Sequence, residues 1–343
     1  MRSVLCLTAA EKDVYNAILF AIKHGKTEFF VSNKVDMQTV SNLVKIVLAE
    51  NSEYFYYDNC EINYLGIGHK RIVKLTKWLS PLSVRLYVDK FNAESQRIID
   101  NVVKSGMSKM QKILSIHNYL VENVTYFGGI NGINGYQHYH TAYGAIVDTS
   151  AVCEGIAAAF CHLLSVVGIE STIVNGTTQE ARDYGHTWNI LKVDGKCYHF
   201  DVTWNLKNKD DSSFPCLDYF ALKDSDLIKR NWNRRLYPLC NDDDMNFFKV
   251  TKSIANSDNE LISIAKRQAK NSKGIYIKCP YLNHLRSDEQ YFNYISNIIN
   301  SNIAMIDPPI LADLNLLTLL SLMQGGATFR INEEQSIVCV IKQ

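Results

Sequence analysis

The segment "HTWNILKVDGKCYHFDVTW", residues 186–204, constrains the fold of this 343-residue chain more than any other stretch. Two runs that alternate between apolar and polar residues flank the dipeptide Asp194-Gly195. Asp-Gly between alternating runs is one of the strongest short signals for a β-hairpin with a two-residue turn. Such a turn pairs Val193 with Lys196, and every other cross-strand pair follows from that register. The segment therefore predicts an antiparallel hairpin whose pairing is fixed along its length.

The register divides the side chains of the hairpin between two faces, because successive residues of a strand point to opposite sides. One face is expected to hold His186, Trp188, Ile190, Cys197, His199, Asp201 and Thr203. The other face, the expected core face, holds Leu191, Val193, Tyr198, Phe200, Val202 and Trp204. On the first face His186 and Asp201 are diagonal neighbours, whose backbones lie about 7–8 Å apart in an antiparallel pair. An imidazole and a carboxylate can bridge that distance, so the register predicts a His–Asp pair.

A second informative stretch is "DTSAVCEGIAAAFCHLLSVVG", residues 148–168, which has the pattern of a helix. Its apolar residues recur at spacings of three and four, and a glycine ends it. The N-cap is expected at Asp148, Thr149 or Ser150, which places Cys153 in the first turn. Backbone N–H groups there lack helical partners, and the helix dipole favours negative charge. Because such a setting favours thiolate over thiol, Cys153 is a candidate nucleophile.

A cysteine at a helix start and a His–Asp pair on a hairpin supply a nucleophile, a base and a group that orients the base. The two stretches, residues 142–176 and 185–205, resemble the transglutaminase-like, papain-related superfamily, and within it the bacterial cysteine peptidase branch. That family combines a C-E-G helix start, an H-x-W-N strand and a D-x-T-W segment after a D-G hairpin, and all three occur here in order. The stretch "IHNYLVENVTY", residues 116–126, resembles the helix that precedes the family core.

The resemblance covers about residues 95–235 and implies roles for three residues. Cys153 matches the family nucleophile, His186 the base, and Asp201 the carboxylate that orients the base. This chain has Ile156 where the family often has an aromatic residue, a change that we expect to affect packing. His199 shares the face of His186 and is a rival base, ranked lower because the family motif does not use it.

What the resemblance implies for function is acyl transfer from an amide of a protein or peptide substrate. A thioester on the cysteine is then resolved by water, which gives a peptidase or deamidase, or by an amine, which gives transamidation. The same groups serve both reactions, so the sequence leaves them open. The alternative is a catalytically silent transglutaminase-like scaffold that binds a protein or glycan partner. An adaptor role dominated by the terminal regions is a third possibility.

Three further positions are expected to contact substrate, namely Gln137, Tyr143 and Trp188, the last as a wall of the cleft. The side chain that completes the oxyanion site is left open among Gln137, Tyr139 and Tyr143. No metal or other cofactor is expected. His138 and His140 have no further ligands at a suitable spacing.

The fold expected from these patterns is α+β, with the cysteine-bearing helix packed on an antiparallel sheet and two small α/β or α+β domains beside it. The expected domains are residues 1–93, 94–240 and 241–343, the middle one catalytic and the others of unknown role. Helices are expected at 8–24, 37–51, 94–123, 258–270, 288–300 and 311–323, and further strands at 27–32, 170–176, 274–279, 302–306 and 336–341.

Composition adds expectations about partners and location. Lys and Arg (36) nearly balance Asp and Glu (35), so no charge excess favours nucleic acid or an anionic membrane. Nine irregularly spaced cysteines without a C-x-x-C pair are typical of reduced thiols in a cytosolic protein. A charge as early as Glu11 argues against a signal peptide, and the apolar segment 310–323 is too short to span a bilayer. We therefore expect a cytoplasmic enzyme, with the oligomeric state left open.

Overall fold

The structure is a computed structural model, which describes residues 4–67, 70–128, 137–179, 185–206 and 216–342, apart from 272–273, 286, 288–289, 292, 296, 299–326 and 333. It combines helices with antiparallel sheets, which confirms the expected α+β class. The chain forms two compact units, one of residues 1–206 with 221–242 and one of residues 207–220 with 243–343. The division into three domains at residues 93 and 240 stays a prediction.

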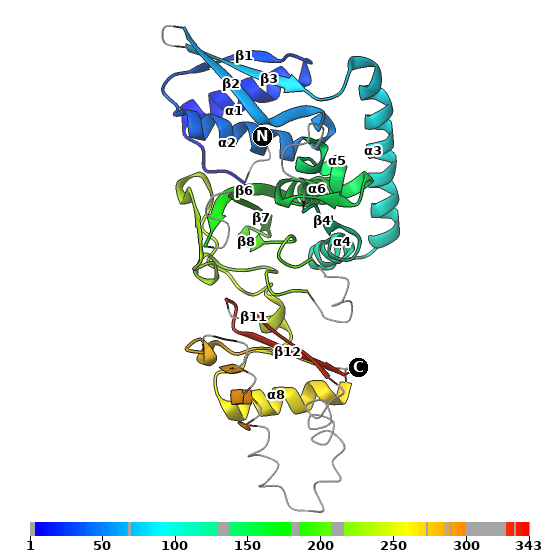
Figure 1. Cartoon of the computed structure of the whole chain (residues 1–343), viewed down its shortest axis with the longest axis vertical. Helices are drawn as coiled ribbons and strands as arrows, with labels where there is room; N and C mark the ends of the chain where they lie inside the picture. The colour runs from blue at the N-terminus through cyan, green and yellow to red at the C-terminus, as the bar shows by residue number, and fades with distance from the viewer. Residues whose placement is uncertain are drawn as a thin grey trace, which may run out of the picture. The chain divides into compact units, whose positions relative to one another are not determined.

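The first unit begins with a helix–strand–helix segment and two long strands. These elements are α1 (Ala9–Lys23), β1 (Glu28–Ser32), α2 (Met37–Glu50), β2 (Tyr57–Ile67) and β3 (Lys70–Lys77). The strands form an antiparallel sheet in the order β1-β3-β2. α1 starts at a capping box, in which the Thr8 side chain accepts from the Glu11 N–H and the Glu11 side chain accepts from the Thr8 N–H. In Figure 1, α2 lies between this sheet and the layer that contains α6.

Two helices follow where the sequence pattern predicts one helical stretch over residues 94–123. α3 (Pro81–Val102) begins earlier, capped by Ser80, and continues through position 93. α4 (Lys109–Asn123) is capped by Ser108. Between the helices Gly106 has φ +83°, a left-handed conformation that glycine adopts without strain, and this turn separates the two helices.

A helix-on-sheet layer follows in the first unit. It contains β4 (Thr125–Tyr126), η2 (Gln137–His140), α5 (Ala142–Val147), β5 (Ser150–Ala151), α6 (Cys153–Val166), β6 (Glu170–Thr178), β7 (His186–Val193), β8 (Lys196–Phe200) and β9 (Arg230–Trp232). The sheet order is β8-β7-β6-β9. Val193 pairs with Lys196, and both Asp194 (φ 51°) and Gly195 (φ 85°) have positive φ, so the predicted two-residue hairpin is confirmed.

Both faces of this sheet are buried, whereas the sequence pattern predicts one core face and one less apolar face. On one side the Asn189 side chain donates to the carbonyl of Ala157 in α6. On the other side Trp188 and His199 are each 1% exposed and contact the ring of Trp232 from β9. The cover comes from a segment 30 residues beyond the hairpin, so the local alternation of residues does not reveal it.

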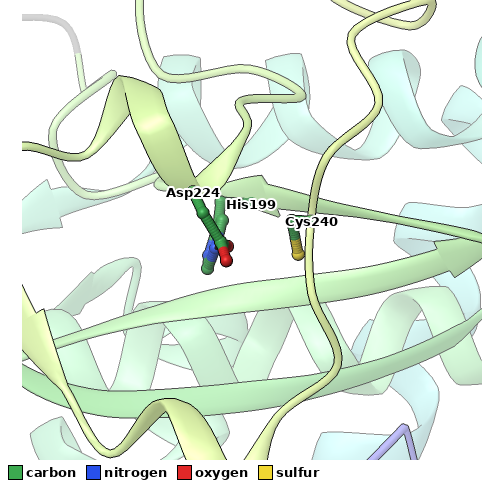
Figure 2. A group of neighbouring side chains, drawn as sticks. All are labelled: His199, Asp224 and Cys240. Atoms are coloured by element: carbon green, nitrogen blue, oxygen red, sulfur yellow. The ribbon is translucent and has the colours of Figure 1, made fainter.

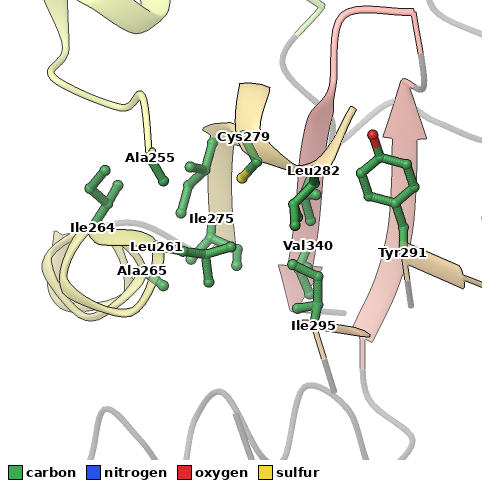
Figure 3. Packing of buried hydrophobic residues seen from close by; sticks show 12 residues of the cluster. Ala255, Leu261, Ile264, Ala265, Ile275, Cys279, Leu282, Tyr291, Ile295 and Val340 are labelled. Carbon is green, nitrogen blue, oxygen red and sulfur yellow. The ribbon is translucent and has the colours of Figure 1, made fainter. Parts of the chain in front are cut away.

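The second unit contains α7 (Phe247–Val250), α8 (Asp258–Asn271) and a three-stranded sheet in the order β10-β12-β11. The strands are β10 (Gly274–Lys278), β11 (Ala327–Asn332) and β12 (Ile337–Lys342), of which β11 was not expected. Figure 3 shows apolar side chains of α8 packed against those of β10 and β12. The expected elements at 302–306 and 311–323 lie outside the described residues, and 288–300 is described only in part.

Asp218 accepts hydrogen bonds from Arg330, Asn332 and Tyr276, which joins the segment before residue 220 to this sheet.

Among the helices in the described part of the chain, none has both the length and the apolar composition that a membrane crossing requires.

Candidate active site

Cys153 is the first residue of α6, as the sequence predicts, but the expected cap is wrong. The N-cap is Val152, whose side chain makes no capping hydrogen bond. The expected cap residue Ser150 lies in β5 and pairs with Thr125 of β4 in a short parallel ladder. The first turn of α6 therefore has no side-chain cap, and its N–H dipoles are directed toward the region of the Cys153 side chain.

The glycine of the C-E-G motif lets the chain pass close to this first turn. A Cβ atom on Gly155 would lie 2.4 Å from the carbonyl oxygen of Tyr139 and 2.8 Å from that of Thr141. Both distances are shorter than van der Waals contact, and both neighbours are backbone atoms. Gly155 is therefore required for η2 to pack against the helix that carries Cys153.

His186 and Asp201 form the pair that the hairpin register predicts. Nε2 of His186 lies 2.6 Å from Oδ2 of Asp201, and both side chains are buried. The ladder between β7 and β8 ends at the pair of Asn189 with Phe200, so Asp201 follows the last paired residue. Its second oxygen, Oδ1, accepts the backbone N–H of Trp204 at 3.0 Å. Both carboxylate oxygens are thus held by donors.

His186 also forms a hydrogen bond with the thiol of Cys153. Because Nε2 faces Asp201, Nδ1 is the nitrogen that faces the sulfur. Burial lowers the pKa of His186, but the charge and hydrogen bond of Asp201, with a contribution from Cys153, raise it to about 9. Burial raises the pKa of Asp201, but the charges of His186 and Arg230 hold it below its usual range. The pair is therefore an imidazolium and a carboxylate near neutral pH.

Arg230, on β9, is a member of the site that sequence reasoning missed. Its guanidinium is buried and donates through Nη1 to Oδ2 of Asp201, the oxygen that also faces His186. The guanidinium carbon lies 5.3 Å from the ring centroid of Trp188 and 4.5 Å from that of Trp204. No motif marks Arg230, because its place depends on the pairing of β9 with β6.

Tyr126, on β4, is a second member that sequence reasoning missed. It pairs with Ala151, two residues before Cys153, and its hydroxyl forms hydrogen bonds with the Cys153 thiol and with the Cys153 backbone. Burial and the nearby thiol raise the pKa of Tyr126 to about 12, so it is a phenol and not a phenolate at neutral pH. Tyr126 is 53% exposed and Cys153 is partly exposed, so both residues reach the surface. The resemblance of "NVTY" to the family was a signal, but it assigned no role to the tyrosine.

The other predicted site residues lie in different surroundings. Trp188 is 1% exposed with its ring 5.8 Å from that of His186, so it supports the imidazole from within the core. Tyr143 is 4% exposed and its ring lies 4.9 Å from that of Phe55 in an aromatic cluster. The structure therefore does not bring Tyr143 to Cys153. Gln137 is half-buried at the start of η2.

Two more histidines and Tyr139, one of the three predicted oxyanion candidates, lie near α6. Tyr139 stacks on Phe127 with ring centroids 4.0 Å apart. His140 lies 2.8 Å from a carboxylate oxygen of Glu154, and His138 lies 3.5 Å from one of Asp148. Each of these histidines thus has a carboxylate partner.

Glu154, next to Cys153, is anchored by a cation from the N-terminal part of the chain. Nζ of Lys45, on α2, contacts one carboxylate oxygen and His140 contacts the other. Burial by itself raises the pKa of Glu154. The hydrogen bonds and charges of His140 and Lys45 outweigh burial and lower the pKa to about 2. A small cavity of about 20 Å³ beside these groups has room for about one water molecule. It is too small for a peptide, so it is not a substrate site.

A second buried histidine, His199, forms a polar cluster with Asp224 and Cys240 (Figure 2). The ligand atoms of these three residues all lie within 4.8 Å of one another, a spacing that a metal ion could use. However, Nδ1 of His199 accepts the Nε1–H of Trp188 at 3.0 Å, so the neutral ring carries its proton on Nε2. Nε2 lies 2.8 Å from Oδ1 of Asp224 and donates that proton to it. The lone pair that a metal would need on Nε2 is absent, so the arrangement is a hydrogen-bonded relay that holds Trp188.

Comparisons with known proteins identify a family for part of the chain. Residues 96–202 match the family model of the Transglutaminase-like superfamily, which confirms the predicted resemblance for that segment. No curated protein matches the chain. Similar solved structures include a protein of Cytophaga hutchinsonii provisionally assigned as a cysteine protease (12% identity, 42% of this chain and 61% of that one, TM-score 0.28) and a TGase (13%, 51% and 50%, TM-score 0.30). Menin, in a structure that reveals its binding site for the Mixed Lineage Leukemia protein, also matches (13%, 89% and 53%, TM-score 0.28). The chain thus spans about half to three fifths of the length of these proteins.

Proposed function

We propose that the transglutaminase-like segment, residues 96–202, is the catalytic part of a thiol-dependent acyl-transfer enzyme in which Cys153, His186 and Asp201 act together. One observation carries the proposal. His186 contacts the Cys153 thiol while its Nε2 lies 2.6 Å from Oδ2 of Asp201. A nucleophile, a base and a group that orients the base are the parts that acyl transfer from an amide requires.

The first half of the proposed reaction forms a thioester. In the starting state the thiol proton rests on His186 as an imidazolium, and the Cys153 thiolate attacks the carbonyl carbon of the substrate amide. The carbonyl oxygen becomes an oxyanion, for which the backbone N–H of Cys153 and the hydroxyl of Tyr126 are the proposed donors. The C–N bond then breaks as His186 gives its proton to the leaving amine, and the acyl group stays on the sulfur.

The second half returns the enzyme to its starting state. His186, neutral after the first half, takes a proton from water, the resulting hydroxide attacks the thioester carbon, and the C–S bond breaks to release the Cys153 thiolate beside the His186 imidazolium. This path makes the protein a peptidase or a deamidase. An amine in place of water gives transamidation with the same groups, and we propose protein or peptide substrates for both paths.

A catalytically silent scaffold that binds a protein or glycan partner is the second candidate. The observation that favours it is the position of Tyr126, whose hydroxyl contacts the thiol that a substrate would have to reach. In that case Cys153 would remain covered in solution and would react more slowly than an exposed cysteine of the same chain.

The test is the rate at which iodoacetamide alkylates Cys153 as a function of pH, measured by peptide mass spectrometry. Cys6 is exposed and supplies the reference rate, and buried Cys161, whose pKa burial raises to about 12, supplies the unreactive reference. We expect Cys153 to react faster than Cys6 below pH 7, and to lose this advantage in His186→Ala. His24→Ala, which removes an exposed histidine, should leave the rate unchanged.

A Cys153 that reacts no faster than Cys6 at any pH would overturn the enzyme proposal and favour the scaffold. If Cys153 is activated, a peptide library assayed for cleavage, ammonia release and amine incorporation separates peptidase, deamidase and transamidase. Cys153→Ala, which removes the proposed nucleophile, is the control in each assay.

A further inference from the structure

We infer that Arg230 is a positioning residue for the His186–Asp201 pair, and that its charge limits how strongly Asp201 holds the imidazole proton. The inference deepens the proposed function, because it assigns a further residue to the same site. Arg230 contacts the carboxylate and not the thiol, so it acts through Asp201.

The contacts place two cationic donors on one oxygen atom. Arg230 donates through Nη1 to Oδ2 of Asp201, and Nε2 of His186 lies 2.6 Å from the same Oδ2. The other oxygen, Oδ1, is taken by the backbone N–H of Trp204. Since Arg230 and Asp201 are 5% and 2% exposed, water does little to screen the charges.

Two indole rings hold both cations in place. The guanidinium carbon of Arg230 lies 5.3 Å from the ring centroid of Trp188 and 4.5 Å from that of Trp204. The imidazole of His186 lies 5.8 Å and 5.6 Å from the same two rings. Aromatic faces stabilise a desolvated cation, so the rings favour a charged guanidinium beside a charged imidazole.

The backbone fixes the position of Arg230 from the other side. Arg230 pairs with Thr178, and Trp232 pairs with Gly176, which in turn pairs with His186. A Cβ atom on Gly176 would lie 2.6 Å from the ring of Trp188 and 2.4 Å from the carbonyl oxygen of Asn231. Because residue 176 has no side chain, β9 and the Trp188 ring can both pack closely against β6. This packing places Arg230 near His186.

The consequence is electrostatic. The positive guanidinium repels the imidazolium and partly neutralises the charge of the Asp201 carboxylate. Both effects lower the pKa of His186 relative to a pair without Arg230. His186 therefore gives its proton to a leaving amine more readily than it would beside Asp201 alone. The other titratable groups that face this pair are Cys153 on α6 and His117 on α4. Burial lowers the pKa of His117 to about 4, so it is neutral and adds no competing charge near pH 7.

The test is an NMR titration of His186 in protein with labelled histidines, in a Cys153→Ala background so that the thiol does not titrate with it. We expect Arg230→Met to raise the midpoint of His186 by about 1–3 pH units, the size of effect typical of one nearby charge. Arg230→Lys, which keeps a positive charge, should shift it less than Arg230→Met does. Arg234→Met is the matched control, because Arg234 stacks on Trp232 and faces Asp224, away from Asp201.

A folded Arg230→Met protein whose His186 midpoint equals or falls below that of the parent would overturn the inference. If the methionine variant does not fold, Arg230→Gln replaces it, since glutamine keeps a hydrogen-bond donor without the charge. If neither neutral variant folds, Arg230→Lys decides, because a midpoint shifted by a full unit despite the retained charge would overturn the inference. The titration does not depend on a reactive Cys153. If Cys153 is not activated in the alkylation test but Arg230→Met raises the His186 midpoint, the proposed function is wrong and the role of Arg230 is still supported.

Discussion

Tyr126 is the residue that we expect to affect how easily a reagent reaches the Cys153 thiol. Its hydroxyl forms hydrogen bonds with the thiol and backbone of Cys153, while its ring is half-exposed. We expect Tyr126→Phe to raise the alkylation rate of Cys153 about 5-fold, because one hydrogen bond contributes about 1 kcal/mol. The measurement is the alkylation rate relative to Cys6. Tyr119→Phe, on an exposed part of α4, is the control, and equal rates in the two variants would contradict the prediction.

The raised pKa of His186 predicts how stability changes with pH. The folded pKa, about 9, is above the ordinary histidine value of 6.5, so protonated His186 stabilises the fold fully below pH 6.5 and less as the pH rises through 9. We expect the free energy of unfolding to fall by on the order of 3 kcal/mol over this window. Urea denaturation at several pH values measures it. Subtracting the profile of His186→Gln isolates this residue, and parallel profiles for the two proteins would show that the shift is absent.

Residue by residue, the sequence predicts the parts of the site that local patterns define. The Asp-Gly turn determines which residues of the hairpin can meet, so the contact of His186 with Asp201 follows from counting residues. Arg230 and Tyr126 reach the site through pairings with β6 and β5, which depend on tertiary packing. No local pattern in the sequence encodes those pairings.

At the scale of elements, the start of α6 depends on the close approach of η2. A methyl group at position 155 would overlap the backbone oxygens of Tyr139 and Thr141. We expect Gly155→Ala to lower the free energy of unfolding by about 1–3 kcal/mol, the usual result of overpacking, and to slow alkylation of Cys153. Thermal and urea denaturation check the first effect. Gly128→Ala, where nothing lies within 4 Å of the added atom, is the matched control and should change neither quantity.

Element boundaries show where pattern and packing differ. The helix at α6 and the register of the hairpin are confirmed, although most residues of α6 and both faces of the hairpin strands are buried. The N-cap is displaced because Ser150 pairs with β4, and the polar face of the hairpin is covered because β9 returns to the sheet. Contacts with distant segments thus determine where an element ends and which of its faces is covered. Periodicity in the sequence predicts only the type of the element and its central residues.

At the scale of the whole first unit, Lys45 connects the N-terminal segment to α6, the helix that carries Cys153. It contacts the partly buried Glu154, 109 residues away in sequence, and no sequence pattern gives a signal for this contact. We expect Lys45→Met to lower the free energy of unfolding by about 1–3 kcal/mol at pH 7, because the partly buried Glu154 carboxylate then keeps only His140 as a partner. Lys74→Met is the matched control, since Lys74 and Glu28 form an exposed pair that contributes about 1 kcal/mol or less.

The contribution of the Lys45–Glu154 pair to stability should depend on pH, and this dependence tests the prediction for Lys45→Met. The pKa of Glu154 is lowered to about 2 from 4.5, so its stabilising effect is present above pH 4.5 and is lost as the pH falls toward 2. The loss of stability in Lys45→Met should therefore shrink on acidification. A loss of equal size at pH 7 and at pH 3 would show that packing, and not charge, is responsible.

The path of the chain between the two units has a consequence for recombination. Residues 207–220 belong to the second unit although they lie between β8 and β9 of the first, so the backbone crosses from one unit to the other three times. A gene fusion joined at residue 242 would keep Asp218 but discard Arg330 and Tyr276, which hold it. The second unit therefore cannot be exchanged as a cassette at a single junction, and any natural or engineered swap must replace two stretches of sequence at once.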